Sequence, residues 1–239
     1  MAEIKPNYDT KRKKLAEVIP LAAPFTVYIE QTKYCNFKCF YCIHSTRDEA
    51  DGEFRALGHR MQHMDEVFFE KIIRELKEFP QDVIKRIVFS GLGEPLMNPH
   101  LPDYVRMVVE AGIAGRVEII TNGLLLTPEK SRALVAAGIT NINISVQGLD
   151  AEGYQKTCGV LIDFDRYLEN LKYLYEHKGN VQIYIKAIDA TLKTKENEEK
   201  FFRIFSPFAD RIYIEHLVVM QQQMDGLREI VDGTKNFYG

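Results

Sequence analysis

Two hydrophobic patterns alternate along this chain of 239 residues. Short runs rich in β-branched and aromatic residues predict strands. These strand candidates cover residues 25–31, 84–90, 116–122, 141–147, 181–188 and 211–217. Between them, apolar residues recur at the spacing of an amphipathic helix. The helix candidates cover residues 64–79, 101–111, 128–137, 164–176 and 195–205. The alternation predicts an α/β fold built from about six βα repeats.

The connections between these units limit the topology. Consecutive parallel strands need right-handed crossovers, so a series of βα units curls into a barrel or forms an open doubly wound sheet. The pattern alone leaves both open. In either case, chemistry gathers at the carboxyl ends of the strands. The ends of the predicted strands are therefore where candidate site residues are expected.

Unusual residues do follow the predicted strands. The first strand is followed by YCNFKCFYCIH (34–44), and the second by GLGEP (91–95). The later strands end in or near polar or glycine residues, namely Asn122, Gly123, Ser145, Gln147, Lys186 and His216. The segment 43–61 is long for a βα connection, which indicates a functional or mobile loop.

Composition narrows the class of protein. The chain is 46% hydrophobic with a net charge of -3, which fits one sizeable domain and gives no nucleic-acid-binding face. Four unevenly placed cysteines do not form a disulfide framework and favour a reducing cytoplasm. The longest apolar stretch, residues 18–29, contains two prolines and is too short to cross a bilayer. We expect a soluble, cytoplasmic protein that binds neither nucleic acid nor membrane.

Three of the four cysteines, Cys35, Cys39 and Cys42, stand within eight residues in the spacing C-x3-C-x2-C. Zinc usually takes four tetrahedral ligands, and electron-transfer clusters usually take four thiolates. The nearest possible fourth ligands are His44, His59 and His63. A structural zinc site or a non-catalytic iron-sulfur protein therefore remains an alternative. Three thiolates also suit a cluster of four irons in which one iron has no protein ligand.

The cysteine spacing, with Tyr41 just before the last cysteine, resembles the signature of the radical S-adenosylmethionine (radical SAM) enzymes. The resemblance implies a partial (β/α)6 TIM-type barrel in which Cys35, Cys39 and Cys42 bind a [4Fe-4S] cluster. It also implies that S-adenosylmethionine (SAM) chelates the open iron. Reductive cleavage of SAM then yields a 5'-deoxyadenosyl radical that abstracts hydrogen from a substrate.

Further positions extend the resemblance from about residue 26 to residue 217. GLGEP is similar to the family's glycine-rich GGEP segment, in which glycines let the backbone approach the ligand and Glu94 accepts from the ammonium of SAM. The cofactor-binding residues implied by the resemblance are Tyr41, Gly91, Gly93, Glu94, Asn122, Ser145 and Gln147, with Glu30 at the mouth. Lys186 and His216 are substrate-side candidates.

Residues 154–159 and 163–177 resemble the subgroup that carries a C-terminal SPASM extension with auxiliary clusters. No cysteine follows Cys158, so this chain cannot build those clusters: either the protein is a minimal form, or the chain stops where that extension would start. Cys158 itself is interpreted as a small buried residue. The expected division is an N-terminal helical extension (1–23), the core barrel (24–220) and a tail (221–239).

The resemblance implies a flavodoxin or ferredoxin as electron donor and an unknown organic substrate, with a peptide or a sugar nucleotide favoured.

Overall fold

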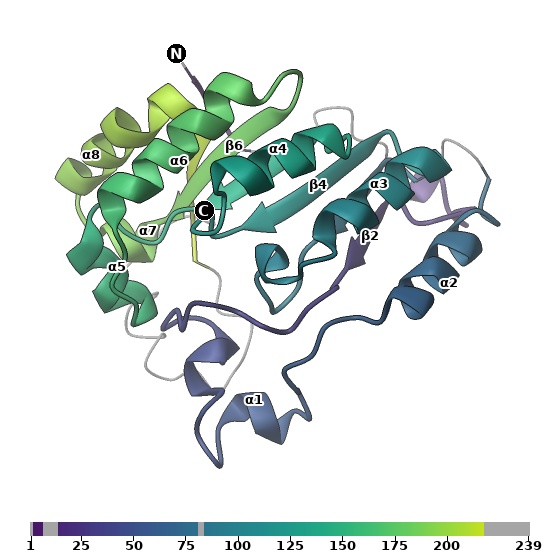
Figure 1. The fold of residues 1–239 in the computed structure, drawn as a ribbon, viewed down its shortest axis with the longest axis horizontal. Coiled ribbons are helices and arrows are strands. Elements are labelled where there is room, and N and C mark those ends of the chain that lie inside the picture. The colour runs from purple at the N-terminus through teal and green to yellow at the C-terminus, as the bar shows by residue number, and fades with distance from the viewer. Residues whose placement is uncertain (1, 7–13, 81–83, 218–239) are drawn as a thin grey trace.

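The structure is a computed structural model that describes residues 2–6, 14–80 and 84–217. Its centre is one parallel sheet, which Figure 1 shows with the helices around it. The sheet has seven strands in the order β1-β7-β6-β5-β4-β3-β2. The strands are β1 (Glu3–Ile4), β2 (Thr26–Ile29), β3 (Arg86–Phe89), β4 (Arg116–Thr121), β5 (Asn141–Ser145), β6 (Gln182–Ile188) and β7 (Arg211–Glu215). The six strands expected from the sequence all form, and β2 to β7 follow one another across the sheet.

The sheet is open, because β1 and β2 lie at opposite edges and do not pair with each other. This confirms the expected partial TIM-type barrel. The short edge strand β1 was not expected: Glu3 pairs with Arg211 and Ile4 with Ile212 on β7. The rest of the described N-terminal extension contains a single 3-10 turn at Leu15–Glu17 instead of an α-helix. Residues 7–13 of the expected helical extension, and the expected tail, lie outside the described residues.

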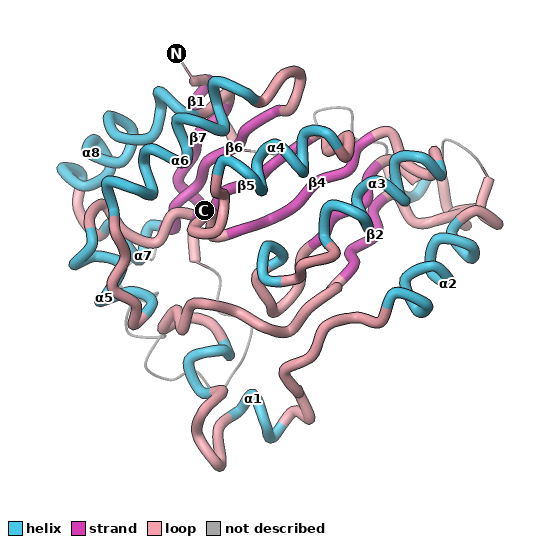
Figure 2. Tube along the Cα trace, in the orientation of Figure 1, coloured by secondary structure: helices cyan, strands magenta, loops and turns pink. Residues whose placement is uncertain are grey.

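Helices fill the crossovers, and α3, α4 and α6 lie over one side of the sheet (Figure 2). Their bounds are α1 (Glu53–Ala56), α2 (Glu66–Leu76), α3 (Leu101–Ala111), α4 (Pro128–Ala136), α5 (Ala151–Cys158), α6 (Phe164–His177), α7 (Asp189–Leu192) and α8 (Lys195–Phe205). Local sequence fixes their ends: the Thr127 hydroxyl accepts from the Lys130 N–H at the start of α4, and Gly112 ends α3 at φ 63°. No described helix is both long and apolar enough to cross a membrane.

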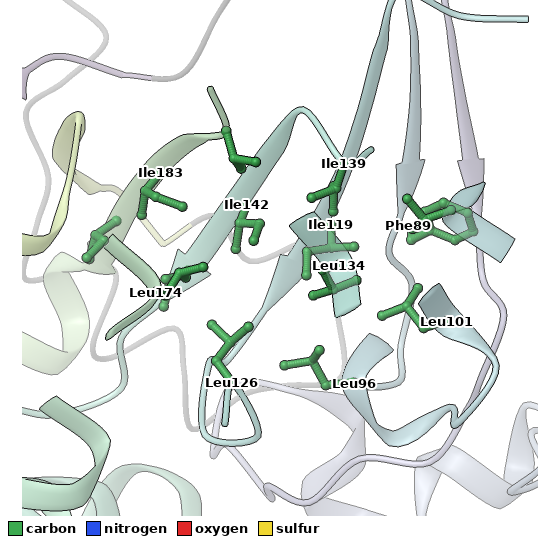
Figure 3. Packing of buried hydrophobic residues seen from close by; sticks show 14 of the residues in the cluster. Phe89, Leu96, Leu101, Ile119, Leu126, Leu134, Ile139, Ile142, Leu174 and Ile183 are labelled. Atoms are coloured by element: carbon green, nitrogen blue, oxygen red, sulfur yellow. The ribbon is translucent and has the colours of Figure 1, made fainter. Parts of the chain in front are cut away.

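The core forms between this helical layer and the sheet. Phe89, Ile119, Ile142 and Ile183 are register partners across four neighbouring strands, and all are buried. Figure 3 shows this row together with Leu134 of α4 and Leu174 of α6. Because side chains alternate along a strand, the neighbouring positions face the other side of the sheet. The continuous apolar row fixes the register and thereby sets where each strand ends.

The amino-terminal half of the sheet contains a buried carboxylate, Glu118 on β4, with 1% of its surface exposed. Its Oε1 accepts from Nη1 of Arg86 at 3.1 Å, and its Oε2 accepts from Nη2 of Arg116 at 2.5 Å. Nδ2 of Asn143 on β5 adds a hydrogen bond at 3.3 Å. Two guanidinium groups therefore compensate this buried charge, and the contacts of Glu118 link β3, β4 and β5.

Candidate active site at the carboxyl ends of the strands

Glu94, in the GLGEP segment after β3, is the most buried acidic group at the carboxyl edge, with 3% of its surface exposed. Its Oε1 accepts from the Thr121 hydroxyl at 2.5 Å and from the Leu96 N–H at 3.0 Å. Its Oε2 accepts from the Asn122 N–H at 2.7 Å. Burial raises the pKa of Glu94, while these three donors oppose the rise. The carboxylate is thus held in one position by neutral donors.

Asn122 connects this carboxylate to the cysteine loop, defined here as residues 34–42. Its Nδ2 donates to Oδ1 of Asn36 at 2.7 Å, and its Oδ1 accepts from the Leu124 N–H at 3.0 Å. Tyr167 of α6 donates its hydroxyl hydrogen to the Asn122 carbonyl at 3.2 Å. Both the side chain and the backbone of Asn122 are therefore fixed between segments far apart in the sequence.

The glycines of GLGEP are required by close packing. A Cβ atom on Gly93 would lie 2.2 Å from the Thr32 carbonyl oxygen, and one on Gly91 would lie 2.5 Å from Oε1 of Glu30. That Glu30 oxygen accepts from the Leu92 N–H at 2.5 Å. In addition, the Glu94 N–H donates to the Tyr34 carbonyl at 2.8 Å. Side chains at these glycines would separate GLGEP from the end of β2 and the start of the cysteine loop.

The carboxyl end of α5 supports the cysteine loop. The Lys38 N–H donates to the Cys158 carbonyl, and the Phe40 N–H donates to the Thr157 carbonyl, both at 3.0 Å. Cys158 is fully buried, as expected from the sequence, and its thiol contacts the thiol of Cys39. The last carbonyl groups of a helix lack partners within the helix. Here two of them hold the cysteine loop in place.

The three clustered cysteines are free thiols, each partly buried. Burial raises the pKa of Cys35 to about 12 and also raises the pKa of Cys42. The contact with Cys158, together with burial, raises the pKa of Cys39 above its usual range. These thiols are therefore protonated at neutral pH until a cation stabilises the thiolate form.

A second polar contact joins the cysteine loop to β5. The Tyr41 hydroxyl donates to Oε1 of Gln147, whose Nε2 donates to the Ser145 carbonyl at 3.1 Å. Gln147 is buried and lies two residues beyond the end of β5. Tyr41, Ser145 and Gln147 therefore lie together at the carboxyl edge.

Lys186 and His216 have carboxylate partners elsewhere on this edge. Nζ of Lys186 lies 2.7 Å from Oε2 of Glu215 on β7, and Nδ1 of His216 lies 2.8 Å from Oδ2 of Asp189. These contacts give both side chains a structural role. Their assignment to the substrate side stays a prediction.

The three histidines near the cysteine loop occupy different surroundings. His44 is fully buried against the ring of Phe54, and burial lowers its pKa to about 4. His59 lies 3.1 Å from Nζ of Lys33 through its Nδ1, and His63 packs on the ring of Tyr34. Within the described ranges, no three His, Cys, Asp or Glu side chains converge on a position for a single metal ion.

Residues 29–205 match the sequence profile of the Radical SAM superfamily. The chain belongs to this superfamily. It is 30% identical over 172 residues to a tungsten-containing aldehyde ferredoxin oxidoreductase cofactor-modifying protein of Pyrococcus furiosus, covering 72% of this chain and 44% of that protein. It is 28% identical over 183 residues to an AdoMet-dependent heme synthase of Methanosarcina barkeri, covering 77% and 46%. The chain thus spans less than half the length of these relatives.

Solved structures of radical SAM proteins share the fold. Streptococcus suis SuiB bound to S-adenosylmethionine aligns with a TM-score of 0.64 and 20% identity, covering 92% of this chain and 49% of that one. AdoMet-bound anSMEcpe aligns with a TM-score of 0.59 and 16% identity, covering 82% of this chain and 52% of that one. Identities this low show likeness of fold only.

The Radical SAM superfamily, to which the chain belongs, consists of enzymes that use a [4Fe-4S] cluster and SAM. Such enzymes need a reductant and an organic substrate. The residues present fit the cluster: three free thiols lie on one loop, close enough for the charges of Cys39 and Cys42 to raise the pKa of Cys35. Nδ2 of Asn36, inside the cysteine loop, is buried without a hydrogen-bond partner among the described residues.

Three contributors to this site were missed by sequence reasoning. Asn36 stands between the ligand candidates, and Thr121 precedes Asn122, so proximity to the motifs was a usable signal for both. The contact of Cys158 with Cys39 spans more than a hundred residues of sequence, and nothing in the local pattern predicts it.

Proposed function

We propose that Cys35, Cys39 and Cys42 bind three irons of the [4Fe-4S] cluster and leave the fourth iron for SAM. The main support is the contact of the cysteine loop with GLGEP and with the end of β4, made through the hydrogen bonds of Glu94 and Asn122. When bound and reduced, the two cofactors supply cleavage of SAM to methionine and a 5'-deoxyadenosyl radical, which takes a hydrogen atom from the substrate.

The surrounding residues position SAM. Glu94 accepts from its ammonium group, because the buried carboxylate has only neutral hydrogen-bond donors in contact and gains most from a cationic one. Gly91 and Gly93 keep the GLGEP backbone close enough to bind it, and Glu30 holds that segment from the mouth of the site. Asn122, Ser145, Gln147 and Tyr41 orient the rest of the molecule. Holding SAM rigidly places its reactive carbon near one substrate hydrogen.

We also propose a low-potential one-electron donor, a flavodoxin or a ferredoxin, because the cluster must be reduced before SAM is cleaved. The substrate class is a peptide or a sugar nucleotide. SuiB was solved with its precursor peptide, but its likeness to this chain is one of fold and does not carry its substrate over.

Anaerobic reconstitution with iron and sulfide tests this function. We expect a brown protein with about four irons per chain and, after addition of dithionite and SAM, formation of 5'-deoxyadenosine and methionine. A colourless protein with stoichiometric zinc would contradict the proposal. So would a cluster that neither binds nor cleaves SAM, which is the behaviour of an electron carrier.

A further inference from the structure

The long segment after the cysteine loop borders an open cavity of about 530 Å³. We call it the arginine cavity. It is lined by Arg47, Asp48, Phe54, Arg55, Gly58, His59, Arg60 and Met61. Its volume lies in the range of small-molecule binding sites. None of the SAM-binding residues proposed above lines it.

The lining of the arginine cavity carries an excess of positive charge. Its arginines Arg47, Arg55 and Arg60 form no ion pair with any residue of the described ranges, and Arg55 and Arg60 are exposed. The one acidic lining residue, Asp48, already forms an ion pair with Lys38. Lys38 first, and Arg47 and Arg55 more weakly, hold the pKa of Asp48 below its usual value. Three guanidinium groups around the arginine cavity thus remain available to bind an anionic ligand.

Arg47 joins this cavity to the cysteine loop. It is half-buried, and its Nη1 donates to the carbonyl oxygen of Phe37 at 2.5 Å. One guanidinium N–H of five is used in the contact with Phe37, which leaves others for a ligand. A ligand bound here therefore lies beside the cysteine loop.

His59 adds a hydrogen-bond donor to the cavity wall. Nζ of Lys33 lies 3.1 Å from Nδ1 of His59, and an ammonium group can only donate. Nδ1 must therefore accept in this contact, which leaves Nε2 as the ring nitrogen that donates. Lys33 also lies 3.9 Å from Glu30, whose other oxygen binds the Leu92 N–H of GLGEP. A chain of polar contacts therefore connects the cavity wall to the proposed SAM site.

We infer that the arginine cavity binds the phosphate groups of the substrate, a small molecule of the size and charge of a nucleoside diphosphate. Guanidinium groups bind phosphate oxygens in bidentate pairs, and three of them match a diphosphate in charge better than they match a single carboxylate. A concave space of this volume suits a small molecule better than the face of an acidic protein. The inference rests on the proposed function, because only an enzyme of that kind would bind this ligand as its substrate. Of the two proposed substrate classes, it favours the sugar nucleotide over the peptide.

Titration of the reconstituted enzyme with uridine diphosphate, without SAM or dithionite, tests the binding site directly. We expect calorimetric binding of uridine diphosphate that weakens as salt is added, and no binding of uridine. Arg55→Ala and Arg60→Ala should each weaken binding at least tenfold. Arg55→Lys should restore part of the loss, because lysine keeps the charge and lacks the planar fork.

Arg74→Ala is the matched control, since Arg74 is an exposed arginine on α2 outside the cavity. It should bind uridine diphosphate as the unaltered enzyme does. Iron content and circular dichroism confirm that each variant is folded and loaded. Equal binding by all variants, or no binding at millimolar uridine diphosphate, would overturn the inference. Variants that only slow reduction by flavodoxin would show instead that the arginines contact the electron donor.

The two proposals can fail separately. Uridine diphosphate binding is measured without SAM cleavage, so an enzyme that binds the ligand and forms no 5'-deoxyadenosine contradicts only the proposed function. An enzyme that cleaves SAM and ignores uridine diphosphate contradicts only the inference about the arginine cavity.

Discussion

Two buried glutamates at opposite ends of the same sheet have different partners. Glu118, toward the amino-terminal end, contacts the guanidinium groups of Arg86 and Arg116. Glu94, at the carboxyl end, accepts from two backbone N–H groups and the Thr121 hydroxyl, and forms no ion pair with a described residue. Lys130, which lowers the pKa of Glu94, donates instead to the Leu96 carbonyl at 2.6 Å.

This difference in partners assigns a stabilising role to Glu118 and a binding role to Glu94 within one sheet. A buried carboxylate paired with two arginines is electrically satisfied and links its strands. A buried carboxylate held only by neutral donors is fixed in place and still has capacity for a cation. In barrels of this kind, residues at the amino end of the strands serve stability and those at the carboxyl end serve chemistry. The four predictions below test this assignment.

The largest effect is expected at the carboxyl edge, from Cys42→Ala. Removing one proposed ligand should abolish iron binding and lower 5'-deoxyadenosine formation by more than about a thousandfold, equivalent to about 4 kcal/mol. Iron analysis and product chromatography measure both effects. Cys158→Ala is the matched control, because it removes a buried thiol outside the triplet and should keep the iron. If Cys42→Ala keeps its iron and Cys158→Ala loses it, the proposed ligand assignment is wrong.

The next effect is expected at the amino end. Glu118→Gln removes the charge that faces Arg86 and Arg116, and we expect the free energy of unfolding to fall by about 2–3 kcal/mol. This figure is below that for a fully buried pair, because both arginine side chains are partly exposed. Urea unfolding measures the loss. The SAM affinity of the folded enzyme should be unchanged. A weakened SAM affinity with normal stability would show that Glu118 serves binding instead of stability.

Glu94→Gln should act mainly on binding. The loss of a charge-assisted contact to the SAM ammonium should raise the dissociation constant about 10- to 30-fold, which corresponds to about 1.5–2 kcal/mol. The amide nitrogen cannot accept, so one backbone N–H loses its acceptor and stability falls by about 1 kcal/mol. Equilibrium binding of SAM measures the affinity. Loss of iron from this variant would show that Glu94 supports the cluster instead.

The smallest effect concerns pH. Burial raises the pKa of Glu94 in the folded chain, so the folded state holds this proton more tightly than the unfolded state does. The resulting stabilisation is complete below the unfolded pKa and is lost as pH rises through the folded pKa. The free energy of unfolding of the apoprotein, measured from about pH 5 to pH 8, should therefore fall more in the wild type than in Glu94→Gln. Parallel curves would mean that Glu94 is ionised throughout.

The sheet was predictable because local patterns determine it. Each β-branched run became a strand, and the buried row from Phe89 to Ile183 explains the register. The helix α5 was missed because Gly153 and several polar residues interrupt its apolar pattern, although Asp150 caps it by accepting from the Gly153 N–H. The strand β1 was missed because two residues carry no periodicity, and pairing with β7 defines it.

The sequence predicted which strand ends carry the candidate site. It did not predict most of the hydrogen bonds that join the site residues. The sequence placed Cys35, Glu94 and Asn122 at one edge, and the structure adds the hydrogen bonds that join them. The contacts of Glu118 with Arg86 on β3 and with Asn143 on β5 depend on the register of three strands, and no local pattern contains that information. The arginine cavity likewise depends on how the segment 43–61 folds back on itself.

The most direct test of the account is electron–nuclear double resonance on the dithionite-reduced enzyme with SAM labelled with nitrogen-15 at its amino group. If the triplet leaves one iron for SAM, the reduced cluster should show a nitrogen-15 coupling that is retained in Glu118→Gln and lost in Cys42→Ala. A reduced cluster with no nitrogen-15 coupling at saturating SAM would mean that no iron is open to this ligand, which contradicts the central claim.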